Sequence, residues 1–146
     1  MSKFTKRYIN KFLYSPLTLK VIDEIELLTN YDVINKFKNR KCDLNIYATC
    51  FIHSKAENSR IELYPLFRKE SEEVRLFILL HEFAHILLEK RNYSESLINL
   101  EFSCDDLASD IARQIKQPAK NPSGRKVTSK VAFNSRLYYE FIKLCV

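Results

Sequence analysis

The chain has 146 residues, a length that fits a single domain with a hydrophobic core of its own. Hydrophobic residues make up 46% of the chain and charged residues 29%, a composition that excludes a disordered or fibrous protein. The formal net charge is +6, and the chain contains only one glycine and four prolines, so we expect a basic and mainly helical domain.

Charge is unevenly distributed along the chain, and this distribution bears on the partners that the protein could bind. Basic residues dominate both ends, whereas residues 21–110 carry an excess of acidic groups. Basic ends could contact nucleic acid or an acidic partner, but solvated charge is the more common meaning of such a pattern. No apolar run approaches the roughly 20 residues of a membrane span, and the N-terminal residues lack the apolar core of a secretory signal. We therefore expect a cytoplasmic protein that does not enter a membrane, with its four cysteines as free thiols.

The first predicted elements are one helix and two strands. Apolar residues recur at helical spacing in residues 17–29, which predicts an amphipathic helix. Residues 44–53 and 60–66 are rich in strand-forming side chains and are separated by a polar segment. We expect these two runs to pair as antiparallel strands, the second of which ends at Pro65 because proline lacks a backbone donor.

Three helices are predicted in the second half of the chain. The first spans residues 70–90 and the second about residues 98–116. Residues 117–128 contain two prolines and the only glycine, which predicts a loop or linker to a short C-terminal helix at residues 129–145. The order of helix, strands and further helices favours an α+β fold. We expect residues 1–146 to form one domain, in which a small antiparallel sheet packs on the helices.

The predicted helix at residues 70–90 contains an HExxH arrangement formed by His81, Glu82 and His85. Histidines four residues apart project from one face of a helix, so both can bind one metal ion, and Zn²⁺ suits two imidazole nitrogens. Glu82 lies beside that face, where its carboxylate can take a proton from a zinc-activated water. The rest of the helix is apolar nearly all round, which predicts a buried helix in which unpaired polar groups would be costly. The alternative is a pair of hydrogen-bonded core histidines without an ion.

A catalytic zinc ion usually has a third protein ligand. On the predicted helix at residues 98–116, Glu101 lies within the apolar stripe that faces inward, and Asp105 lies on its margin. Asp106 and Asp110 are expected to point away from that stripe. We therefore predict Glu101 as the third ligand and Asp105 as the acceptor of the second N–H of a metal-bound histidine. A boundary carboxylate without a ligand role is the alternative for Glu101.

Cys104 lies one turn from Glu101 on the same inward side of the predicted helix. A thiolate is a good zinc ligand and a redox-sensitive group, so either role is conceivable. A cysteine in this position is more often a small buried hydrophobic residue, and that interpretation is the favoured one.

Two segments of the chain resemble the active-site segments of the ImmA/IrrE family of zinc peptidases. In VRLFILLHEFAHILL, residues 74–88, the HExxH residues lie within an apolar helix, and in EFSCDDLA, residues 101–108, a glutamate precedes an acidic residue by four positions. The resemblance extends over about residues 44–118 and implies a compact, zincin-like α+β domain of the gluzincin type. Members occur in phages, mobile elements and stress regulons, and several are thought to relieve transcriptional repression by cleaving a repressor.

The predicted function is that of a zinc-dependent endopeptidase that cleaves a regulatory, DNA-binding repressor, with Glu82 as general base. The substrate is expected to lie extended along the strand at residues 60–64 as an added edge strand. Spacing does not single out an oxyanion donor; the candidates are His53, Tyr93, Tyr138 and Tyr139. Two alternatives are a metal-stabilised module that sequesters a regulator without cutting it, and a basic domain that binds nucleic acid directly. Mn²⁺ or Fe²⁺ could replace zinc at a site with two histidines and a carboxylate.

Overall fold

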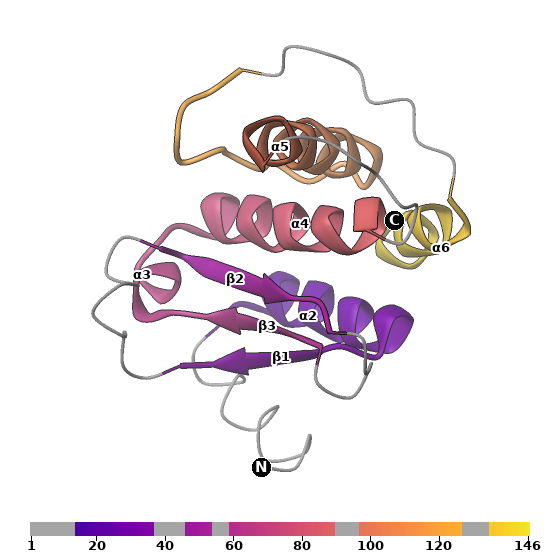
Figure 1. Ribbon diagram of the computed structural model, residues 1–146, viewed down its shortest axis with the longest axis horizontal. Coiled ribbons are helices and arrows are strands. Elements are labelled where there is room, and N and C mark those ends of the chain that lie inside the picture. Colours follow the sequence, from indigo (N-terminus) through magenta and orange to yellow (C-terminus); the bar gives the residue numbers. More distant parts are fainter. Residues whose placement is uncertain (1–13, 37–45, 54–58, 90–96, 127–134) are drawn as a thin grey trace.

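A computed structural model of the chain describes residues 14–36, 46–53, 59–89, 97–126 and 135–146. Within these residues, five helices and one three-stranded sheet give an α+β fold (Figure 1). In chain order, the elements are α2 (Pro16–Thr29), β1 (Asp32–Asn35), β2 (Ala48–Phe51), β3 (Arg60–Leu63), α3 (Pro65–Arg68), α4 (Glu72–Glu89), α5 (Leu97–Gln114) and α6 (Arg136–Cys145).

The sheet is mixed, with the strand order β1-β3-β2. β2 and β3 pair antiparallel with Cys50 opposite Ile61, which confirms the predicted pair. β1 runs parallel to β3 with Val33 also opposite Ile61, so the prediction of a purely antiparallel sheet is wrong. β1 has only four residues, and it begins with aspartate and ends with asparagine, two residue types that are rare in strands.

The strand order also corrects the predicted position of the substrate. β3 is the central strand, and its backbone is paired on both sides, so residues 60–63 cannot accept a further strand. β2 is the edge strand on the side of α4, as Figure 1 shows. A peptide that adds to the sheet near α4 must therefore pair with β2.

The predicted helices are confirmed, and local capping explains several of their ends. α2 begins after Ser15, whose hydroxyl accepts a hydrogen bond from the Thr18 N–H, and ends at Asn30 in the left-handed conformation. α4 begins after Ser71, whose hydroxyl accepts a hydrogen bond from the Val74 N–H. α6 begins after Ser135. The predicted residues 129–134 of that helix lie outside the described residues.

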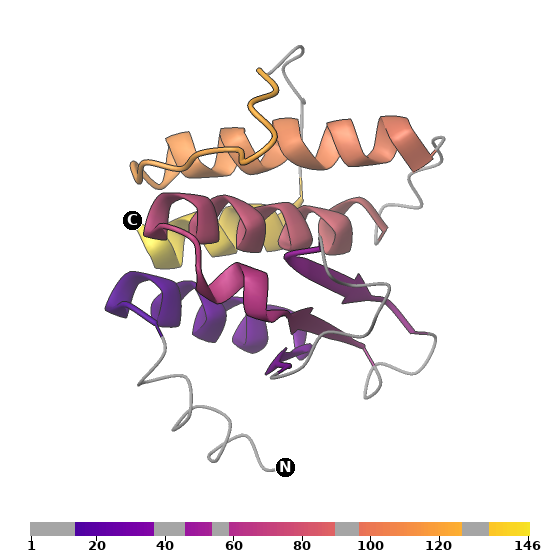
Figure 2. The same ribbon diagram turned by 90° about the vertical axis from the view of Figure 1, so that its left-hand side faces the viewer.

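α4 is the central helix of the molecule. Figures 1 and 2 show α5 on one side of it and the sheet with α2 on the other, while α6 lies alongside. Most side chains of α4 are buried, including the fully buried Phe83, whose ring centroid lies 4.4 Å from that of Phe141 on α6. Within the described part of the chain, no helix has the length and apolar character needed to cross a membrane.

The segment that follows α5, residues 117–126, forms no helix or strand and is called here the return segment. It leaves α5 through Lys116, which has a positive φ of 58°. The Lys120 N–H donates to the Glu73 carbonyl at the start of α4, over 3.1 Å. A turn follows in which the Gly124 N–H donates to the Asn121 carbonyl, and Gly124 adopts a φ of 75° that favours glycine. The predicted loop is therefore attached to the helices rather than extended away from them; residues 127–128 lie outside the described residues.

Candidate metal centre

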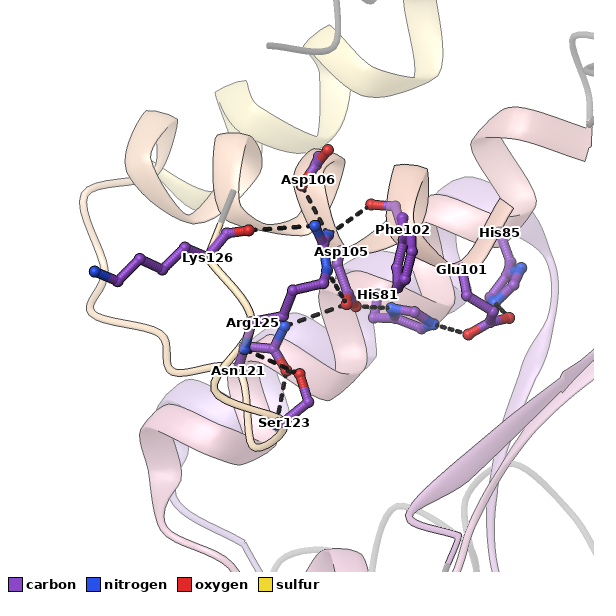
Figure 3. A network of polar contacts seen from close by, with 10 residues as sticks. All are labelled: His81, His85, Glu101, Phe102, Asp105, Asp106, Asn121, Ser123, Arg125 and Lys126. Carbon is purple, nitrogen blue, oxygen red and sulfur yellow. Dashed lines mark hydrogen bonds and ion pairs between the residues drawn. The ribbon is translucent and has the colours of Figure 1, made fainter. Parts of the chain in front are cut away.

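His81 and His85 lie on the face of α4 that meets α5, with their ring centroids 4.9 Å apart. The carboxylate of Glu101 on α5 contacts both rings (Figure 3). Its Oε2 lies 3.0 Å from His81 Nε2, and its Oε1 lies 3.0 Å from His85 Nε2. The structure thus brings together the three residues that the sequence analysis predicted as ligands, from two different helices.

His81 is held between two carboxylates of α5. Its Nε2 contacts Glu101, while its Nδ1 lies 2.7 Å from Asp105 Oδ1. The spacing of one helical turn between Glu101 and Asp105 gives each nitrogen of one imidazole its own acidic partner. Such an outer carboxylate fixes the ring orientation and leaves Nε2 to face an ion.

The pKa values of these groups reflect their mutual contacts. Burial opposes protonation of His81, but the hydrogen bonds with Asp105 and Glu101 outweigh it and raise the pKa of His81 to about 10. Hydrogen bonds from His81 and His85 lower the pKa of Glu101 well below its usual range. Burial works against ionisation of Asp105, yet the contact with His81, followed by those with Arg125 and Asn121, lowers its pKa. The site is therefore a set of ionised carboxylates around a protonated imidazole.

Glu82 points to the other side of the histidine pair, toward the sheet. Its side chain is buried and accepts a hydrogen bond from the Cys50 backbone N–H of β2. Burial raises the pKa of Glu82, an effect that the neighbouring His81 and His85 partly offset. A buried carboxylate with a raised pKa beside two imidazoles is typical of a general base.

Among the described strands, β2 is paired only with β3, and its other edge faces this carboxylate. The Tyr47 carbonyl accepts a hydrogen bond from the Tyr64 N–H at 3.0 Å, so the backbone of Tyr47 faces the neighbouring strand. Backbone groups alternate in direction along an antiparallel strand, and those of Ala48 and Cys50 therefore face away from β3. The contact between the Cys50 N–H and Glu82 agrees with this direction.

A pocket of about 410 Å³ adjoins His81, Glu82 and Glu101. On one side it is bounded by β2 and the residues before it, and on the other by the return segment. Its lining residues are Ile46, Tyr47, Ala48, Phe77, Ile78, His81, Glu82, Glu101, Asp105, Asn121, Pro122 and Ser123.

The side chains present fit a zinc ion. Two imidazoles and a carboxylate are ligands that zinc accepts, and they converge from rigid helices. The ligand atoms of His81, His85 and Cys104 also lie within 4.8 Å of one another, so a thiol belongs to the candidate metal-binding group. Cys104 is fully buried, and burial raises the pKa of its thiol. Its location satisfies both interpretations of the sequence, the buried small residue and the thiol ligand.

Three of the four predicted oxyanion donors, His53, Tyr138 and Tyr139, are not brought to the pocket. His53 is exposed after β2, and its backbone N–H donates to the Ser59 hydroxyl at 2.9 Å. The Tyr138 hydroxyl donates to Asp110, and Tyr139 is exposed on α6. These three residues are absent from the pocket lining, and Tyr93 lies outside the described residues.

Asp106 contacts the return segment and not the histidines, in line with its predicted direction, but its side chain is buried. The return segment covers that face of α5, and Asp106 Oδ1 accepts a hydrogen bond from Arg125 Nη2 at 2.8 Å. Sequence reasoning also missed Asn121 and Arg125, both of which contact Asp105. The only sequence signal for them was the Asn-Pro-Ser-Gly turn that reverses the chain.

The described residues therefore include a candidate metal-binding group formed by His81, His85 and Cys104, with the carboxylates of Glu101 and Asp105 in contact with its histidines. Comparison of the chain with models of known protein families, with characterised proteins and with solved structures gives no match. The functional argument consequently rests on the geometry of this site.

Proposed function

We propose that the chain is a zinc-dependent endopeptidase with a zincin-like arrangement of active-site helix and edge strand. His81, His85 and Glu101 would hold the ion. The observation that carries the proposal is that the Glu101 carboxylate lies 3.0 Å from the Nε2 atoms of both histidines, beside a pocket lined by His81, Glu101 and the buried Glu82. A metal site that served stability alone would need neither the pocket nor the buried carboxylate of Glu82.

The bound ion would polarise the scissile carbonyl and lower the pKa of a water toward about 7. With an ion held there, Glu82 would take a proton from the attacking water and pass it to the leaving amine. Burial raises the pKa of Glu82, which makes its carboxylate a stronger base than that of an exposed glutamate and suits this role. The Cys50 N–H orients the Glu82 carboxylate, and Asp105 orients the His81 ring.

A peptide in extended conformation is the substrate that the edge strand suits best. The outward backbone groups of Ala48 can pair with a peptide that lies between β2 and the return segment. The pocket lining includes the apolar side chains of Ile46, Phe77 and Ile78, which favour an apolar substrate side chain. We propose a regulatory, repressor-type protein as the natural substrate, on the resemblance of residues 74–88 and 101–108.

Metal content and peptide cleavage test the proposal together. Purified wild-type protein should contain one zinc per chain, His85→Ala and Glu101→Ala should lose it, and Cys104→Ala should keep it. Glu82→Gln should keep zinc but cleave a random peptide library, followed by mass spectrometry, about 10²- to 10⁴-fold more slowly. Wild-type rates of cleavage in Glu82→Gln would refute the role of Glu82.

A non-cleaving, metal-stabilised module that binds a regulator is the second candidate. The observation that favours it is the nearness of Cys104 to both histidines, because a site closed by four protein ligands is structural rather than catalytic. This candidate predicts that Cys104→Ala loses zinc and that no peptide is cleaved by any variant. The nucleic-acid alternative stays a prediction, and the basic residues 3–11 on which it partly depends lie outside the described residues.

A further inference from the structure

Arg125 of the return segment forms the most extensive polar contacts around the candidate site (Figure 3). Its Nε lies 3.3 Å from Asp105 Oδ2, and its Nη2 lies 2.8 Å from Asp106 Oδ1. The same Nη2 donates to the Phe102 carbonyl at 2.9 Å, and the guanidinium lies over the Phe102 ring, 4.6 Å from its centroid. One side chain therefore joins the return segment to three residues of α5 that lie within about one helical turn, Phe102, Asp105 and Asp106.

The two oxygens of the Asp105 carboxylate have different partners. Oδ1 lies 2.7 Å from His81 Nδ1, whereas Oδ2 accepts hydrogen bonds from Arg125 Nε and from Asn121 Nδ2 at 3.2 Å. With one oxygen held by the return segment, the other is aimed at the imidazole. A carboxylate without these partners could rotate about its χ2 bond, which has a broad torsional profile.

The return segment also supplies one wall of the pocket. Asn121, Pro122 and Ser123 line it, and the Asn121 Oδ1 accepts hydrogen bonds from both the backbone N–H and the hydroxyl of Ser123. Lys120 attaches the segment to the start of α4, and Asn121 and Arg125 attach it to α5 through Asp105. Residues that shape the pocket and the residue that orients Asp105 thus belong to one short segment.

We propose that Arg125 is a positioning residue: it holds the Asp105 carboxylate, which in turn orients the His81 ring, and it keeps the 121–123 turn against the pocket. This inference rests on the proposed metal site. Arginine is suited to the task because its planar fork reaches two adjacent carboxylates at once, which a lysine ammonium cannot do with the same geometry.

Zinc affinity, measured by competition with a chelator, tests the proposal. Loss of an outer hydrogen-bond partner typically lowers metal affinity by about 10- to 100-fold. We expect a loss in that range for Asp105→Asn, and roughly tenfold for Arg125→Met, whose effect passes through Asp105. The matched control is Arg136→Met, which removes an exposed arginine paired with Glu140 at 2.8 Å and should leave the affinity unchanged.

A double-mutant cycle separates positioning from a general loss of structure. Because Arg125 acts through Asp105, Arg125→Met should lower zinc affinity no further in the Asp105→Asn background. Equal losses in both backgrounds, or no loss in the wild-type background, would overturn the proposal. Arg125→Lys serves in the same cycle if Arg125→Met does not fold, with the same outcomes for and against.

A measurement on the metal-free protein tests the role of Arg125 even if the chain proves not to bind zinc. If the wild type binds no metal, the metal site is refuted, but the ¹⁵N chemical shift of His81 Nδ1 still reports the contact with Asp105. At fixed pH this shift should change in Arg125→Met or Arg125→Lys and stay constant in Arg136→Met. An unchanged shift in both Arg125 variants would show that Arg125 does not position His81.

Discussion

Zinc binding to the metal-free protein should release a proton from His81. The hydrogen bonds with Asp105 and Glu101 outweigh burial and raise the pKa of His81 to about 10, so at pH 7 the imidazole carries protons on both nitrogens. A metal-bound imidazole must be neutral, and Nε2 must lose its proton before it can face an ion. Glu101 is already ionised, since its pKa is lowered by the two histidines, and it contributes no proton.

The size of this effect follows from the pKa of about 10. At pH 7, removal of the proton costs about 1.4 kcal/mol for each of about three pH units, on the order of 4 kcal/mol in all. The apparent affinity for zinc should therefore rise roughly tenfold per pH unit between pH 7 and pH 9, and level off as the pH approaches the pKa of His81. A site with a neutral His81 would show no such slope.

Calorimetry in buffers with different ionisation enthalpies counts the protons released. The wild type should release about one more proton at pH 7 than Asp105→Asn, in which His81 loses its closest carboxylate partner at 2.7 Å. A wild-type affinity that does not depend on pH, together with equal proton release by the two proteins, would refute the arrangement in which Asp105 and Glu101 hold a protonated His81.

Three further predictions concern the core, the edge strand and the base. Phe83→Ala should lower the unfolding free energy by about 3–5 kcal/mol in chemical denaturation, whereas Tyr139→Ala on the exposed face of α6 should change it by less than about 0.5 kcal/mol. Ala48→Pro removes an N–H that faces away from β3 and should keep fold and zinc but weaken peptide binding; Thr49→Pro, which removes a ladder donor, should destabilise the fold itself. Burial raises the pKa of Glu82, so its ionisation costs stability as the pH rises above the usual carboxyl range. Metal-free Glu82→Gln should therefore exceed the wild type in stability at pH 8 but not at pH 4, as judged from denaturation midpoints.

Helical periodicity explains why most of the site could be predicted. The spacing of His81 and His85 determines that both rings lie on one face of α4, and the spacing of Glu101 and Asp105 does the same on α5. Each helix is long and strongly patterned, so its inward face can be identified without knowledge of its partner. The contact between the two faces then follows, because both must be buried.

Contacts that depend on distant segments could not be predicted in this way. β1 has four residues without a distinct pattern, and its parallel pairing with β3 passes over an intervening strand. Asp106 points away from α4 as expected, yet it is buried because the return segment covers that side of α5. Periodicity gives the direction of a side chain on its own helix, but it does not predict which distant segment covers that face of the helix.

Asp105 and Asp106 point in different directions from α5. This difference explains how the Arg125 guanidinium can lie close to the candidate metal site without pairing with the Glu101 carboxylate. Successive residues on a helix differ by about 100° in direction, so Asp105 reaches His81 while Asp106 turns toward the return segment. Arg125 contacts these two aspartates, and Glu101, one turn earlier, is left to the two histidines. A guanidinium displaced by one turn would pair with Glu101 and occupy the carboxylate that an ion needs. The position of Arg125 thus provides charge compensation for α5 and orientation for His81, while the ligand face of Glu101 stays accessible from the pocket.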